Sequence, residues 1–278
     1  MSILPPNRHP FEVQALHLRS YPYSESDLIV VLFTREYGLI RAIARGVRKP
    51  RSRLAGLISP LRCNHLLLHR GRNLHGISQA ESVHAFAGLQ QDYDRLMVGL
   101  AIGELVAQFC QEEDAQPELY QVLLATLYQL SASARPREVL LWFLLYFLAH
   151  QGFYQDWHQC QACSVRFGPS DKRFQNVRDG GLRCEKCRQS PDHRLLSLAQ
   201  AQTLIAIQQI PAPEPLLERD QVPYLNPPLE LGEKEVNGLI WNLQQLLQQL
   251  AGHELRTFAF LYPNQANDTT LSQRGTPS

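Results

Sequence analysis

The sequence lacks a hydrophobic run long enough to cross a membrane. Its most apolar stretch, Val139–Ala149, is about half of the roughly 20 residues that a membrane-spanning helix needs. The opening residues Met1–Arg8 contain no apolar segment after a basic start, which argues against a secretory signal peptide. We therefore expect a cytoplasmic protein that makes no contact with membranes.

Motifs that carry enzymatic chemistry are also missing. The sequence contains no P-loop, no G-x-S-x-G, no H-E-x-x-H and no acidic cluster suited to two metal ions. The acidic stretches Asp92–Asp94 and Glu112–Asp114 fall at the ends of predicted helices, where solvation and the helix dipole account for them. We therefore predict that the protein is not an enzyme.

The balance of charges differs between the two ends of the chain. The 278 residues carry a net charge of +1, and a hydrophobic content of 44% with 19% charged residues predicts a folded chain of at least two domains. Residues 1–80, however, hold 12 Lys and Arg against 4 Asp and Glu, whereas the remainder holds 15 against 22. A concentrated basic region attracts polyanions over a Debye length of about 10 Å, so an anionic partner is predicted. A merely solvated basic face is the alternative.

The pattern of residues 1–85 is that of a small barrel. Short apolar stretches separated by turn residues predict strands at Glu12–Arg19, Asp27–Thr34, Leu39–Arg45, Leu61–His69 and Leu74–His84. Five short strands with a basic loop after the third favour a barrel of the OB type over a sandwich. Because side chains alternate along a strand, Arg41 and Arg45 share one face of the third strand, opposite Ala42.

Residues 86–262 have a helical period, so the predicted fold class is α+β with a barrel followed by a helical domain. Helices are expected from Asp92, from Pro117 through Leu130, from Pro136, at Ser197–Ile210 and at Glu233–Ala251, with a proline-bearing linker at Pro211–Pro228. The third of these has a strongly apolar face and should lie at the centre of a bundle; its residues are Leu140, Phe143, Leu144, Phe147 and Leu148. An irregular insertion is expected at residues 157–190 and a disordered tail at 263–278.

Four of the six cysteines form the most specific signal in the sequence. Cys160 and Cys163 make one C-x₂-C pair, and Cys184 and Cys187 make a second pair after twenty intervening residues, which is typical of a zinc ribbon. Two disulfides would require an oxidising compartment, and a redox pair would require a single C-x-x-C. Four protein ligands leave no open coordination position, so we predict one structural Zn²⁺. Three histidines lie near enough in sequence to replace a ligand, namely His150, His158 and His193, and with four cysteines present they are expected to be surface or supporting groups.

A run of six cations without an acid predicts the nucleic-acid surface. Its members are Arg41, Arg45, Arg48, Lys49, Arg51 and Arg53. Each contact with a phosphate releases a counterion, so six contacts would give a logarithmic salt slope of about −5 on duplex DNA. Four more arginines near strand ends are predicted to extend the surface: Arg35, Arg62, Arg70 and Arg72. Candidates for stacking on bases are Tyr21, Tyr23, Phe33 and Tyr37, although core or turn packing is the alternative for the last two.

Taken in this order, the chain up to about Pro263 resembles the RecO family of bacterial recombination mediators. The resemblance is carried by Tyr23–Asp27, Leu32–Leu39, Gly46–Leu54 and Gly152–Tyr154. It implies an N-terminal OB-fold, a helical domain and a zinc-binding insertion. It also implies binding of single- and double-stranded DNA, annealing of complementary strands, and help, in company with RecR, in replacing single-strand-binding protein with RecA, at the nucleoid.

Two parts of the resemblance do not transfer to particular residues. Where the family has a Ser-Arg pair near the end of the last helix, this chain reads His253–Phe258. A pocket for the tail of single-strand-binding protein is implied in the helical domain, and no motif places it.

Three other functions are also compatible with these features of the sequence. An RNA-binding protein with an OB-fold and a zinc ribbon would prefer RNA to DNA of equal length. A nuclease or deaminase that uses the zinc would need an open coordination site. An assembly adaptor would dock its basic face on an acidic protein and would not bind nucleic acid.

Overall fold

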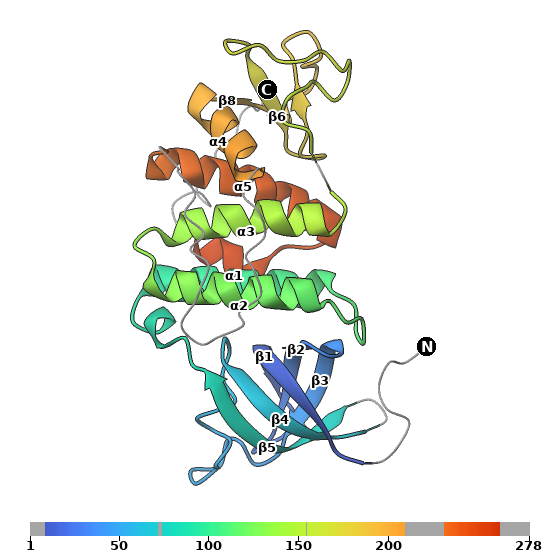
Figure 1. Ribbon diagram of the computed structural model, residues 1–278, viewed down its shortest axis with the longest axis vertical. Helices are drawn as coiled ribbons and strands as arrows, with labels where there is room; N and C mark the ends of the chain where they lie inside the picture. The colour runs from blue at the N-terminus through green and yellow to red at the C-terminus, as the bar shows by residue number, and fades with distance from the viewer. Residues whose placement is uncertain (1–8, 72–73, 154, 209–230, 262–278) are drawn as a thin grey trace, which may run out of the picture.

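The computed structural model describes residues 9–71, 74–153, 155–208 and 231–261, which form an elongated molecule in three tiers (Figure 1). A β-barrel lies at one end, a layer of helices in the middle, and the cysteine-bearing segment at the other end. The predicted linker at Pro211–Pro228 and the predicted tail at 263–278 fall outside the described residues.

The barrel has five strands, as predicted, and their order is that of an OB-fold. The strands are β1 (Phe11–Pro22), β2 (Leu28–Thr34), β3 (Gly38–Ala44), β4 (Cys63–His69) and β5 (His75–His84). They close in the order β1-β2-β3-β5-β4, with β1 paired to β4 and a short parallel pairing between β3 and β5. Alternate side chains such as Val30, Leu32 and Ile40 fill the interior, as the period of two predicts.

The alternate side chains that point away from the barrel interior pack against the helices. Leu16, Val31 and Phe33 belong to the same buried cluster as the helical core. Phe33 is fully buried with its ring centroid 6.1 Å from that of Tyr120, and Cys63 Sγ lies 3.3 Å from the Tyr120 hydroxyl. Burial raises the pKa of Cys63 to about 11. Phe33 is thus a core residue rather than a stacking platform, and the domain boundary after residue 85 stays a prediction because buried side chains run across it.

The helices begin and end close to the predicted positions, for local reasons. They are α1 (Tyr93–Phe109), α2 (Pro117–Ala132), α3 (Pro136–His150), α4 (Leu198–Gln208) and α5 (Glu233–Ala251), with short 3₁₀ turns η1 (Ala87–Leu89) and η2 (Arg256–Phe260). The Asp92 side chain accepts a hydrogen bond from the Arg95 amide at the start of α1, and a proline occupies the first turn of both α2 and α3. Left-handed Gly252 ends α5. None of the helices in the described part of the chain is long and apolar enough to span a membrane.

The cysteine-bearing segment is more regular than the sequence suggested. It contains a three-stranded antiparallel sheet in the order β7-β6-β8, made of β6 (Arg173–Asn176), β7 (Leu182–Arg183) and β8 (His193–Leu196). The expectation of an irregular insertion at residues 157–190 was wrong at β6 and β7, because strands of two to four residues are too short to show a period. A buried hydrogen bond from Asn242 Nδ2 to Gln175 Oε1, 2.8 Å long, ties this sheet to α5.

The loop between α1 and α2 lies against the β2–β3 turn. The Glu113 amide donates to the Leu39 carbonyl at 3.0 Å, and Leu39 and Glu112 form an isolated parallel β-bridge. Gly38 has a φ of +67°, and a Cβ atom there would lie 1.8 Å from the Asp114 carbonyl oxygen. The barrel and the helical layer therefore meet here through a position that only glycine fills without strain.

We expect Gly38→Ala to destabilise the protein by about 2–4 kcal/mol, because it combines a strained backbone angle with an overlap against backbone atoms. Gly252→Ala is the matched control. Its φ is +73° and no heavy atom lies within 4 Å of the added Cβ, so it carries the backbone cost alone. Denaturant unfolding of both variants measures the difference, and equal losses would show that the loop moves aside freely.

Candidate nucleic-acid interface and metal centre

The basic loop that follows β3 is held in place by the β1–β2 loop. Asp27 Oδ1 accepts hydrogen bonds from the Gly46 amide at 2.8 Å and from the Ser26 hydroxyl at 2.9 Å. The Arg48 amide donates to the Ser26 carbonyl at 3.0 Å. The hydrogen bond from Gly46, followed by that from Ser26, lowers the pKa of the Asp27 carboxyl, so the anchor stays ionised at neutral pH. The Tyr23–Asp27 motif thus fixes where the cations of the next loop begin.

Five of the predicted cations extend from this loop into solvent. They are Arg45, Arg48, Lys49, Arg51 and Arg53, and all five side chains are exposed. No carboxylate of the described residues lies within 4.0 Å of any of them, and Arg45 acts on Asp27 only at longer range. The charges are therefore available to an external anion.

Arg41 differs from the other five. Its Nε lies 2.6 Å from Glu112 Oε1, and the two side chains are 53% and 51% exposed. The acidic stretch after α1 is therefore more than a solvated helix end, because it neutralises a cation of the predicted surface.

The four additional arginines do not all join the loop. Arg35 is exposed in the β2–β3 turn, at the opposite end of β2 from Asp27. Arg62 is half-buried at the start of β4, where its carbonyl accepts from the His17 amide at 2.9 Å. Arg70 is half-buried and lines a small pocket together with Arg41. Arg72 lies outside the described residues, and a contact between DNA and any of these four stays a prediction.

Two exposed tyrosines remain as candidates for stacking on bases. Tyr21 and Tyr23 are 44% and 58% exposed at the β1–β2 loop, and the guanidinium of Arg19 lies 5.3 Å from the ring centroid of Tyr21. Tyr37 instead packs edge to face on Phe11, with ring centroids 5.5 Å apart. Tyr23 directly precedes the residues that anchor the basic loop, and stacking of either tyrosine on a base stays a prediction.

The structure brings the four predicted cysteines together. The sulfur atoms of Cys160, Cys163, Cys184 and Cys187 all lie within 4.8 Å of one another, and none is in a disulfide. The Sγ atoms of Cys163 and Cys184 are 3.8 Å apart. A zinc ion with Zn–S bonds of about 2.3 Å has tetrahedral edges of about 3.8 Å, so the donor set fits a four-coordinate metal.

Tight turns position these sulfur atoms. Ser164, which has a φ of +57°, donates its amide to the Cys160 carbonyl at 2.8 Å, and the Cys187 amide donates to the Cys184 carbonyl at 3.1 Å. Burial would raise the pKa of Cys160, but hydrogen bonds from the backbone at Cys184, Ala162 and Cys163 outweigh it and lower the pKa to about 6. Hydrogen bonds with the thiols of Cys163 and Cys184 raise the pKa of Cys187 to about 12. Four thiols this close cannot all ionise unless a cation balances them.

Two of the three nearby histidines make other contacts, and the side chain of the third, His158, is exposed. His150 Nε2 donates to Gln116 Oε1 at 3.2 Å, and His193 Nδ1 lies 3.0 Å from the Ser190 carbonyl. Within the described ranges, the ligand cluster contains the four cysteines and no histidine. A four-coordinate metal held by all four cysteines would have no coordination position left for a catalytic water.

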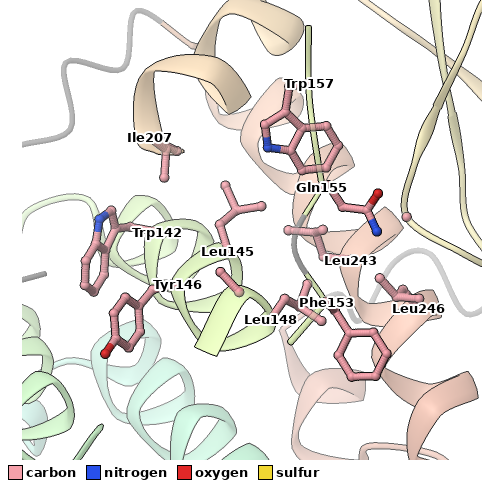
Figure 2. Close-up of a pocket in the computed structure, with 12 residues that line it drawn as sticks. Trp142, Leu145, Tyr146, Leu148, Phe153, Gln155, Trp157, Ile207, Leu243 and Leu246 are labelled. Atoms are coloured by element: carbon pink, nitrogen blue, oxygen red, sulfur yellow. The ribbon is translucent and has the colours of Figure 1, made fainter. Parts of the chain in front are cut away.

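The resemblance implied a pocket in the helical domain without placing it, and the structure contains an apolar pocket in the helical layer (Figure 2). It lies between α3, α4 and α5, with a volume of about 130 Å³, and its lining includes Trp142, Tyr146, Phe153, Trp157 and Leu243. Trp142 and Tyr146 stack with ring centroids 5.4 Å apart. A hint was available in the aromatic side chains spaced four residues apart on α3, but that helix is so apolar that they could not be told from core residues.

The barrel, the helical layer and the four-cysteine segment together define a class: an OB-fold protein with a helical domain and a cluster of four cysteines that could hold a metal ion. Residues 9–86 match the family model described as recombination protein O N terminal, and residues 90–214 match that of recombination protein O C terminal. The chain belongs to the recombination protein O family, which confirms the resemblance drawn from the sequence.

One curated relative is the DNA repair protein RecO of Gloeobacter violaceus. It is 42% identical over 123 residues, which cover 44% of this chain and 47% of the relative. The match thus spans about half the length of each protein.

Proposed function

We propose that this protein is a DNA-binding recombination mediator in DNA repair. The observation that carries the proposal is the anchored loop with its five exposed cations, Arg45 to Arg53, none of which has a carboxylate partner in the described structure. Such cations hold phosphate backbones and do not read base sequence. The family and the name of the relative support the role in repair.

Neutralised phosphates allow two strands to approach each other, which is the physical requirement for annealing. We extend the proposal to binding of single- and double-stranded DNA and to loading of RecA onto DNA covered by single-strand-binding protein, together with RecR. The apolar pocket of Figure 2 suits the apolar end of a partner peptide, and the resemblance supplies a candidate in the tail of single-strand-binding protein.

The metal in this proposal is one structural Zn²⁺ held by Cys160, Cys163, Cys184 and Cys187. It would supply a rigid tetrahedral junction to a segment whose strands are too short to fold alone. A zinc enzyme is the less favoured reading, because four thiolates leave no position for a reacting water. Displacement of a ligand by cyanide or azide would support an enzyme, whereas a closed four-thiolate spectrum after cobalt substitution would contradict it.

We expect binding to a short oligothymidylate to weaken steeply with salt. Five phosphate contacts at about 0.7 counterions each predict a logarithmic slope of about −3.5 on single strands. Fluorescence anisotropy at several KCl concentrations measures this slope. Absence of binding even at low salt would favour the adaptor function. Preferential competition by RNA of equal length would favour the RNA-binding alternative.

A further inference from the structure

The acidic loop after α1 lies at the edge of the proposed DNA surface and is fixed there. The contacts of Glu113 and Glu112 with Leu39 hold its backbone to β3, and the absence of a side chain at Gly38 makes room for Asp114. Gln116 Nε2 donates to Asp114 Oδ2 at 2.9 Å and is itself held by His150. The loop is thus braced from both the barrel and the helical layer.

In this position Glu112 forms an ion pair with Arg41, one cation of the predicted surface. Arg41 lies exposed on β3, and Arg45 directly follows the last residue of that strand, four positions along the chain, so their Cα atoms are at most roughly 14 Å apart. Arg45 is open to solvent, whereas Arg41 forms the 2.6 Å ion pair with Glu112. Glu112 therefore neutralises the one cation of the predicted surface that lies on β3 itself.

The strength of the pair suits competition with phosphate. Both side chains are about half exposed, and ion pairs of that kind contribute little to stability because solvent screens them. Phosphate that follows the loop toward β3 would have to displace Glu112 to reach Arg41. A buried pair would exclude phosphate altogether, while an exposed one only weakens this contact.

We infer that Glu112 is a negative determinant of nucleic-acid binding, which occupies Arg41 and limits the path of the DNA to the loop cations Arg45 to Arg53. The inference rests on the proposed function, since it assigns a boundary to the same surface. Glu112 belongs to the helical part of the chain and would lower the affinity of the barrel for DNA.

The test is binding of oligothymidylate by Glu112→Gln, which removes the charge and keeps the shape of the side chain. We expect affinity to rise about two- to fivefold at low salt and the slope to steepen by about 0.7, one additional phosphate contact. Glu233→Gln is the matched control, because Glu233 is an exposed acid in the first turn of α5, on the far side of the helical layer from the barrel (Figure 1). It changes the net charge equally and should leave the slope unchanged.

The same substitution in an Arg41→Gln variant distinguishes release of Arg41 from a general effect of net charge. In Arg41→Gln the substitution Glu112→Gln should produce no gain, since the cation that it frees is gone. A gain that persists there, or an equal gain in Glu233→Gln, would overturn the inference while DNA binding by the unmodified protein still stood. If the unmodified protein bound no DNA, the proposed function would fail and this inference with it.

Discussion

Reversing the charge at Arg48, Lys49 and Arg51 should abolish DNA binding at moderate salt while the fold survives. The three side chains are exposed on the loop that Asp27 anchors, and none has an acidic partner among the described residues, so their replacement by glutamate breaks no ion pair in this part of the chain. Three lost phosphate contacts should reduce the magnitude of the salt slope by about 2 on single strands, and the new acids repel the backbone besides. Anisotropy titrations and the thermal unfolding midpoint measure the two effects separately.

The matched control reverses Arg166, Lys234 and Arg256, three exposed cations outside the barrel. It changes the net charge by the same amount and removes no predicted contact. If both triple variants lost binding equally, attraction to the whole molecule rather than this loop would be responsible. Binding that persisted in the loop variant would show that the site lies elsewhere.

Replacement of Cys160 by serine is expected to release the metal and loosen the segment around it. Cys160 is the one fully buried ligand, and its loss leaves three thiols facing one another without a complete tetrahedron. Binding free energies of structural zinc reach about 10–16 kcal/mol, so a loss of at least about 3 kcal/mol in the local free energy of unfolding is expected. Limited proteolysis should cut within residues 157–190, and the zinc content should fall from one ion per chain.

Cys110→Ser provides the comparison, since it makes the same chemical change at a buried cysteine outside the cluster. It should retain the metal. DNA binding should change little in Cys160→Ser, because the basic loop lies at the other end of the molecule (Figure 1). Retention of a full complement of zinc by Cys160→Ser would show that the four cysteines are not the ligand set.

The sequence by itself determined the elements and the two chemical signals. The five strands, the starts of the helices at Asp92, Pro117 and Pro136, and the grouping of four cysteines followed from alternation, capping residues and the spacing of the C-x₂-C pairs. Each of these depends on residues close together in the chain or on a spacing that the chemistry of one ion dictates. Local physics is sufficient for such features.

Only the tertiary structure decided which outward-facing side chains of the barrel are buried against the helices. It also decided which charged side chains form ion pairs. An apolar Phe33 on a strand is compatible with an exposed stacking residue and with a core residue. It is a core residue because α2 packs beside it. The pairing of Arg41 with Glu112 joins residues from two parts of the chain, as does the hydrogen bond between Gln175 and Asn242. Contacts of this kind depend on how the elements pack, and no local period encodes them, so the free cations of the surface could be separated from the neutralised one only in the folded molecule.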